Sequence, residues 1–186
     1  MHTHNTAPTQ FVEAYGIRFA YRRFGKAGGV PIVLNQHFPG TMDHWDPAVT
    51  DGLAREREVI LFNNAGVSTS SGEVPTTFEG VNEKVAPVQR EVIGKWGTPQ
   101  EKPFEYLKSI RQPTLVVNGH KDIIVYTVNS FILQQSIPDA QLILYPDASH
   151  GSIYQYPELF LAHVSLFLSG YGNGTGQVGA IEERPS

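Results

Sequence analysis

The chain has 186 residues, 40% of them hydrophobic, and a formal net charge of −4. Its length suits one domain, and an acidic balance without a basic stripe excludes the electrostatic footprint of a nucleic-acid-binding protein. There is no cysteine, which excludes disulfides and thiolate metal sites.

The amino-terminal part of the sequence predicts a disordered start followed by a β-hairpin. Residues 1–9 are expected to be disordered. The polar start of the chain lacks the apolar core of a signal peptide. Hydrophobic side chains alternate along 17–21 after the turn residues Tyr15-Gly16, which predicts a hairpin over 11–25. No apolar run approaches the about 20 residues of a membrane span. We therefore expect a soluble, cytoplasmic protein with no membrane partner.

Two short apolar runs in the first half of the chain predict buried strands. The run 31–34 leads into Asn35-Gln36-His37-Phe38-Pro39-Gly40, and the run 58–63 leads into a loop of small polar residues that holds Ser68 and Ser70. Loop serines are usually solvated and inert. These two runs alone predict only a buried sheet.

Residues 113–151 predict a strand–helix–strand unit with polar groups at both strand ends. An apolar run stops at Gly119-His120-Lys121-Asp122, and a second stops at Ser149-His150-Gly151. Residues 125–137 between them are long enough for one helix. Asp122 and His150 then lie at the carboxyl edge of a parallel sheet, where sites are built. We expect the Asp122 carboxylate within about 2.6–3.2 Å of a ring nitrogen of His150.

These two segments resemble the acid and histidine segments of α/β-hydrolases, whose catalytic triad follows the order serine, acid, histidine. The resemblance implies that Asp122 orients His150 and that His150 is the general base. The loop 35–40 resembles the oxyanion loop of the same family, which implies that the backbone N–H of Phe38 binds a developing oxyanion. The alternative is that this loop only shapes a strand-to-helix turn.

The nucleophile elbow of that family, Gly-x-Ser-x-Gly, is absent from the sequence. Glycines four residues apart bracket Ala27, Gly172 or Gly174, and never a serine. The resemblance covers residues of about 10–80 and 95–169, so the elbow, the strand before it, the next strand and most of a lid look deleted.

The implied fold is a reduced α/β-hydrolase fold, with an amino-terminal hairpin and a mostly parallel sheet flanked by helices. We expect a single domain over 10–169 and a disordered tail over 170–186. Two lost strands leave a gap of about 10 Å at about 4.8 Å per strand. Either strand 32–34 pairs directly with strand 115–117, or a second copy of the chain fills the gap.

Three functional hypotheses follow. In the first, the chain is of serine-hydrolase lineage, acting on esters or acyl groups, but has lost its nucleophile and is inactive or a truncated product. In the second, it is an accessory protein that holds a small acyl or aromatic ligand. In the third, it is an active hydrolase with a substitute nucleophile such as Ser68 or Ser70. The resemblance implies no cofactor and no metal.

Overall fold

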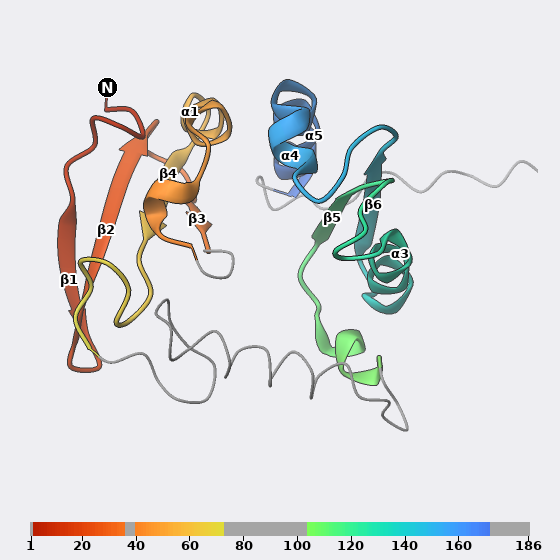
Figure 1. The fold of residues 1–186 in the computed structure, drawn as a ribbon, viewed down its shortest axis with the longest axis horizontal. Coiled ribbons are helices and arrows are strands. Elements are labelled where there is room, and N and C mark those ends of the chain that lie inside the picture. The colour runs from red at the N-terminus through yellow and green to blue at the C-terminus, as the bar shows by residue number, and fades with distance from the viewer. Residues whose placement is uncertain (1, 36–39, 73–103, 172–186) are drawn as a thin grey trace, which may run out of the picture. The chain divides into compact units, whose positions relative to one another are not determined.

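The computed structural model describes residues 2–35, 40–72 and 104–171. The chain divides into an amino-terminal unit, Met1–Pro103, and a carboxyl-terminal unit, Phe104–Ser186 (Figure 1).

The amino-terminal unit holds a four-stranded sheet in the order β1-β2-β4-β3. Its strands are β1 (Gln10–Ala14), β2 (Ile17–Gly25), β3 (Ile32–Leu34) and β4 (Glu58–Phe62). β2 is antiparallel to both β1 and β4, whereas β3 and β4 are parallel.

The predicted hairpin is confirmed, and its turn explains why it forms. Tyr15 and Gly16 both have positive φ angles, of 52° and 75°, and Ala14 faces Ile17 in the register. A two-residue turn with positive φ at both positions matches the right-handed twist of the strands that it joins.

One α-helix and one short 3₁₀ helix accompany this sheet in the described residues: α1 (Pro47–Ala54) and η1 (Met42–His44). Asp46 caps α1, because its side chain accepts a hydrogen bond from the Ala48 N–H at 2.8 Å, and Pro47 stands at the first helical position, where no N–H is needed. Helix α1 packs against β2 and β4. The core contains the buried side chains of Ala20, Phe24, Val49, Leu53, Val59 and Leu61.

The start of the chain differs from the disordered segment that the sequence predicts. The His4 residue is only 3% exposed; its Nδ1 lies 2.9 Å from Thr50 Oγ1, and its backbone N–H donates to Asp51 Oδ1 at 2.7 Å. Its ring meets Phe24 edge-on. Burial lowers the pKa of His4 below its ordinary value, and the positive charge of Arg22 acts in the same direction. One buried histidine therefore anchors a segment whose composition predicts disorder.

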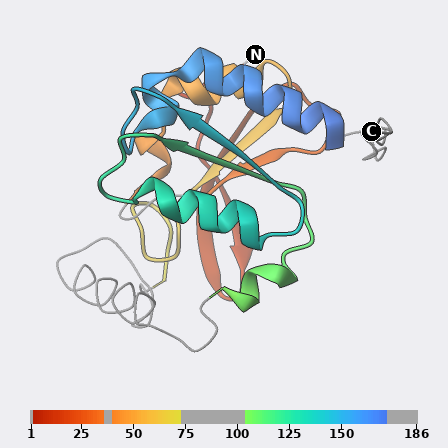
Figure 2. The same ribbon diagram turned by 90° about the vertical axis from the view of Figure 1, so that its right-hand side faces the viewer.

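The carboxyl-terminal unit confirms the strand–helix–strand prediction. The parallel strands β5 (Thr114–Gly119) and β6 (Ala140–Tyr145) pair from Thr114↔Ala140 to Gly119↔Tyr145. The helices are η2 (Glu105–Ser109), α3 (Thr127–Ser136), α4 (Ser152–Gln155) and α5 (Pro157–Tyr171). Figures 1 and 2 show α3 and α5 on opposite faces of the two strands.

Tyr145, at the end of β6, is the best-buried aromatic residue among those that the structure describes in this unit. It is 1% exposed, and its ring stacks on Tyr156 and His163 at centroid distances of 5.5 and 5.8 Å. Its hydroxyl lies 3.0 Å from His163 Nδ1, and burial raises the pKa of Tyr145. His163 is thus a packing partner that holds α5 against the strand.

The hydrogen-bonded strands form two separate sheets. Among the described residues β3 pairs with β4, and β5 pairs with β6, so the direct pairing of strand 32–34 with strand 115–117 is not present. A second copy that fills the gap stays a prediction. In the ranges that the structure describes, no helix is long and apolar enough to cross a bilayer.

Candidate active site

Asp122 follows β5 and uses its two carboxylate oxygens differently. Oδ1 accepts hydrogen bonds from the backbone N–H groups of Ile124 at 2.8 Å and Val125 at 2.9 Å. This bonding to the chain two and three residues ahead is typical of an aspartate that organises a turn. The side chain is 1% exposed, and Oδ2 remains for another partner.

That partner is His150, as the sequence predicts. His150 Nδ1 lies 3.0 Å from Asp122 Oδ2, within the expected hydrogen-bond range. A carboxylate at Nδ1 fixes the proton there, which leaves the lone pair of Nε2 available to accept another. The side chain is 54% exposed, and within the described ranges Nε2 has no hydrogen-bond partner. An imidazole held in this way can accept a proton at Nε2.

Electrostatics keep the Asp122 carboxyl ionised. Desolvation by burial raises the pKa of this carboxyl, but the hydrogen bonds from the Val125 N–H, the His150 ring and the Ile124 N–H together outweigh it. The pKa of Asp122 is therefore below its ordinary value. An ionised carboxylate is what stabilises an imidazolium during proton transfer.

Backbone contacts bring the acid loop and the histidine loop together. The Lys121 N–H donates to the Ala148 carbonyl, and the His120 N–H donates to the Tyr145 carbonyl, both at 2.9 Å. At Gly119 an added Cβ would overlap the backbone of the histidine loop. Only glycine allows this close approach.

Two side-chain contacts also hold the histidine loop. Gln155 Oε1 accepts hydrogen bonds from the Ser149 N–H at 2.8 Å and from Ser149 Oγ at 3.3 Å, which ties the loop to α4. Lys121 Nζ and an Asp147 carboxylate oxygen form an ion pair at 2.8 Å. Both charged groups are exposed, so this ion pair contributes little to the stability of the fold.

Comparison with known proteins finds esterases among the curated sequences that are similar to the chain. No family model matches the chain. A pimeloyl-[acyl-carrier protein] methyl ester esterase of Nitrosospira multiformis is 27% identical over 97 residues, which are 45% of this chain and 37% of that protein. One of Nitrosomonas europaea is 32% identical over 56 residues, which are 30% and 22% of the two chains. The chain thus matches well under half the length of these curated relatives.

Solved structures cover much more of the chain. An α/β-hydrolase fold protein from Chitinophaga pinensis superposes with a TM-score of 0.73 and 27% identity, over 91% of this chain and 100% of that one. The chain belongs to the α/β-hydrolase superfamily. A putative lipase from Acinetobacter baumannii AYE shares the fold with a TM-score of 0.72 and 13% identity, over 92% of this chain and 93% of the lipase.

In this α/β-hydrolase the two candidate substitute serines differ sharply. Ser70 is buried; its Oγ donates to the Asn63 carbonyl and accepts from the Ala20 N–H, both at 2.9 Å. Its hydroxyl is therefore committed to tying the loop to β2, which argues against Ser70 as a nucleophile. Ser68 is exposed and has a φ of 52°, a left-handed conformation that few non-glycine residues adopt.

Other expected parts of an α/β-hydrolase site lie elsewhere or outside the described residues. Phe38 falls in 36–39, which the structure does not describe, so its oxyanion role stays a prediction.

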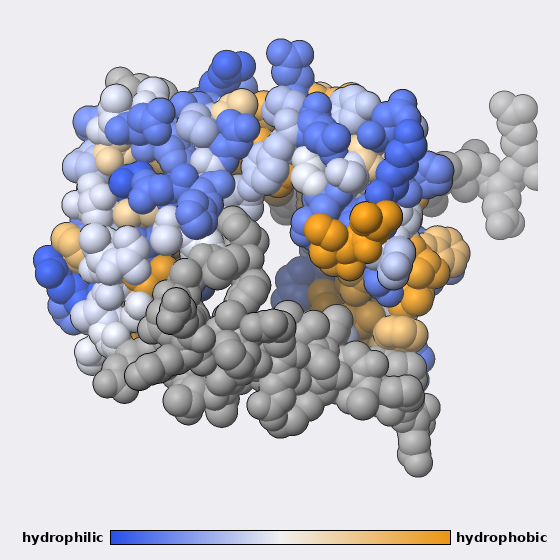
Figure 3. All heavy atoms as spheres, in the orientation of Figure 1, coloured by the Kyte–Doolittle hydropathy of each residue, from blue (hydrophilic) through white to orange (hydrophobic). Residues whose placement is uncertain are grey.

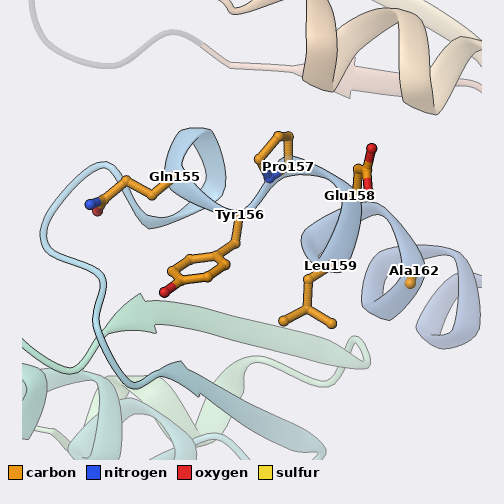
Figure 4. Close-up of a pocket in the computed structure, with 6 residues that line it drawn as sticks. All are labelled: Gln155, Tyr156, Pro157, Glu158, Leu159 and Ala162. Carbon is orange, nitrogen blue, oxygen red and sulfur yellow. The ribbon is translucent and has the colours of Figure 1, made fainter.

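A hollow of about 550 Å³ lies along α4 and α5. Its lining residues are Gln155, Tyr156, Pro157, Glu158, Leu159 and Ala162, and Figure 4 shows the Tyr156 ring and the Leu159 side chain directed toward the strands. In the described part of the chain, no cluster of three His, Asp or Glu residues could hold a metal ion.

The residues that support the pair were not predicted from the sequence. Asn118, Gly119 and Gln155 each fix a part of the two loops. Of these three, only the role of Gly119 could have been predicted from the sequence, because a glycine between a buried strand and a polar turn often indicates a close approach of two backbone segments. Nothing in the sequence distinguishes Asn118 and Gln155 from other polar residues, since their hydrogen-bond partners lie up to 12 residues away.

Proposed function

We propose that this chain is an α/β-hydrolase of serine-hydrolase lineage that keeps the acid and the general base of ester hydrolysis but has lost the nucleophile. The observation that carries the proposal is the 3.0 Å contact between Asp122 and His150 in a sequence without Gly-x-Ser-x-Gly. On this proposal the chain is inactive as an esterase, or is an internally truncated product of a longer active form.

The chemistry of the pair supports this reading. His150 Nε2 would take a proton from a hydroxyl or a water, and the Asp122 carboxylate would stabilise the resulting imidazolium. Proton transfer of this kind is worth about 10²–10⁴-fold in rate. The remaining rate enhancement needs a nucleophile held rigidly, since about 1 Å of misplacement can cost about 100-fold. The nucleophile elbow normally supplies that rigidity.

The ligand that we propose is a small ester or acyl compound. Both curated relatives are pimeloyl-[acyl-carrier protein] methyl ester esterases, so an ester is the chemical class to test first. If the chain has kept a binding role, simple esters should raise its melting temperature, because a ligand that binds only the folded state stabilises it.

The deciding assay is p-nitrophenyl acetate turnover by the wild-type chain and by His150→Ala and Ser68→Ala. We expect the three rates to be equal and close to the uncatalysed background. Turnover well above background that both substitutions abolish would overturn the proposal.

One observation favours a second candidate, an active hydrolase with Ser68 as the nucleophile. The backbone of Ser68 is left-handed, and strained conformations of this kind are concentrated at active sites. The turn is also firmly held, since the Gly66 N–H donates to the Ser71 carbonyl and the Ser71 N–H to Arg18 on β2. The backbone of the loop 66–71 is thus more constrained than its composition of small polar residues predicts.

A fluorophosphonate probe tests this second candidate directly. Ser68 Oγ would attack phosphorus and displace fluoride, while the hydroxyl proton is lost to a general base. Labelling that Ser68→Ala removes and His150→Ala weakens would establish the substitute nucleophile. An unlabelled wild-type chain would reject it.

A further inference from the structure

The segment that supplies both N–H donors to Asp122 has little packing of its own. Ile123 and Ile124 are 79% and 70% exposed, and Figure 3 shows apolar side chains on the surface of the carboxyl-terminal unit. Exposed apolar side chains give a segment few contacts that fix its backbone. The two hydrogen bonds to Oδ1, at 2.8 and 2.9 Å, therefore need another support.

That support is Asn118, a buried residue near the end of β5. Its Nδ2 donates to the Val125 carbonyl at 3.1 Å and to Ser130 Oγ at 3.0 Å, and its Oδ1 accepts from the Gly119 N–H at 2.7 Å. The side chain makes three of the four hydrogen bonds that an amide can make. One residue thus joins the end of β5, the segment 123–125 and helix α3.

The orientation of the Asn118 amide follows from its partners. The Val125 carbonyl can only accept, so the atom that faces it is Nδ2, and the Gly119 N–H can only donate, so the atom that faces it is Oδ1. Asparagine is one of the few side chains that supplies both a donor and an acceptor at this size. The third partner of the amide is the hydroxyl of buried Ser130 on α3, which accepts a hydrogen bond from Nδ2.

Val125 makes the link between this network and the acid. Its carbonyl accepts from Asn118 while its N–H donates to Asp122. Fixing one end of this residue fixes the other, which holds Oδ1 and leaves Oδ2 directed at His150.

We propose that Asn118 is a positioning residue for the Asp122–His150 pair, acting through Val125 and anchored by Ser130. This inference rests on the proposed function, in which that pair is the general base of the site. Asn118 does not reach reacting atoms. It sets the orientation of the acid.

The test follows the carboxyl and the imidazole by NMR in the full-length chain, so it is independent of any esterase activity. The measurements are the titration of the Asp122 side-chain carbon and the His150 Nδ1–H resonance. In Asn118→Ala we expect the pKa of Asp122 to rise toward its ordinary value and the Nδ1–H resonance to be lost to exchange. Tyr145→Phe, which removes a buried hydroxyl contact to His163, should leave both unchanged.

A second pair of variants serves if Asn118→Ala does not fold. Ser130→Ala removes one acceptor of the amide and should shift the pKa of Asp122 in the same direction by less, whereas Ser130→Thr keeps a hydroxyl and should restore the wild-type titration. The inference is overturned if folded Asn118→Ala titrates like the wild type, if Ser130→Ala and Ser130→Thr titrate alike, or if Tyr145→Phe shifts the carboxyl as much. A chain that shows the expected shifts but hydrolyses no ester would support the positioning role all the same.

Discussion

Replacing Gly119 by alanine should separate the two loops that carry the acid and the base. The new Cβ would lie 2.5 Å from the Ala148 carbonyl carbon, where ordinary van der Waals contact is 3.4–4 Å. The neighbouring atoms are backbone, so the loops must move apart by about 1 Å. Overpacking of this kind costs about 1–3 kcal/mol, and the Lys121-to-Ala148 hydrogen bond adds about 0.5–1.5 kcal/mol. We expect a loss of about 1.5–4.5 kcal/mol in the free energy of unfolding.

Urea unfolding with an unchanged m-value measures this loss, and Gly151→Ala is the matched control. Gly151 lies in the same loop, and its added Cβ would meet only Tyr154 Cδ2 at 3.8 Å, which is ordinary contact. We expect that variant within about 0.5 kcal/mol of the wild type. Equal losses in the two variants, or none in Gly119→Ala, would refute the close-approach argument.

Three further predictions concern buried polar groups. Burial lowers the pKa of His4 below 6.5, so the unfolded state binds more protons than the folded state as the pH falls through this range. Wild-type stability should therefore decrease as the pH falls from 6.5 toward the lower folded pKa, and the urea midpoint of His4→Gln should decrease less. The pKa of Asp122 lies below 3.8, so its stabilisation is present above 3.8 and is lost as the pH falls through the folded value; acid titration of Asp122→Asn should show a shallower decline. Ser70→Ala leaves two buried backbone groups unpaired and should cost about 1–3 kcal/mol in thermal or urea unfolding, whereas exposed Ser68→Ala should change stability by less than about 0.5 kcal/mol.

The parts of the fold that the sequence predicted are those determined by local chemistry. Tyr15-Gly16 requires only its own backbone angles to make the hairpin turn. The Asp122–His150 contact spans 28 residues, yet a single strand–helix–strand unit determines it, because parallel strands end at the same edge.

The features that the sequence did not predict depend on distant partners. His4 is buried because Thr50 and Asp51 lie on α1, more than 40 residues along the chain. Ser68 and Ser70 read alike in a loop of small polar residues. The structure distinguishes them, because the Ser70 hydroxyl is hydrogen-bonded to the Ala20 N–H on β2 and to the Asn63 carbonyl. Such choices are made by tertiary contacts that composition and spacing do not encode.

The two oxygens of Asp122 have different partners, so Asp122 and His150 are under different evolutionary constraints. Oδ1 organises the turn after β5, so natural selection for folding alone would retain Asp122 in a chain with no catalysis. His150 is half-exposed, and its side chain bonds, among the described residues, only to Asp122. Random drift should therefore erase the histidine first. Persistence of histidine at this position across descendants of the gene would be evidence that the site is still in use, whereas persistence of the aspartate would not.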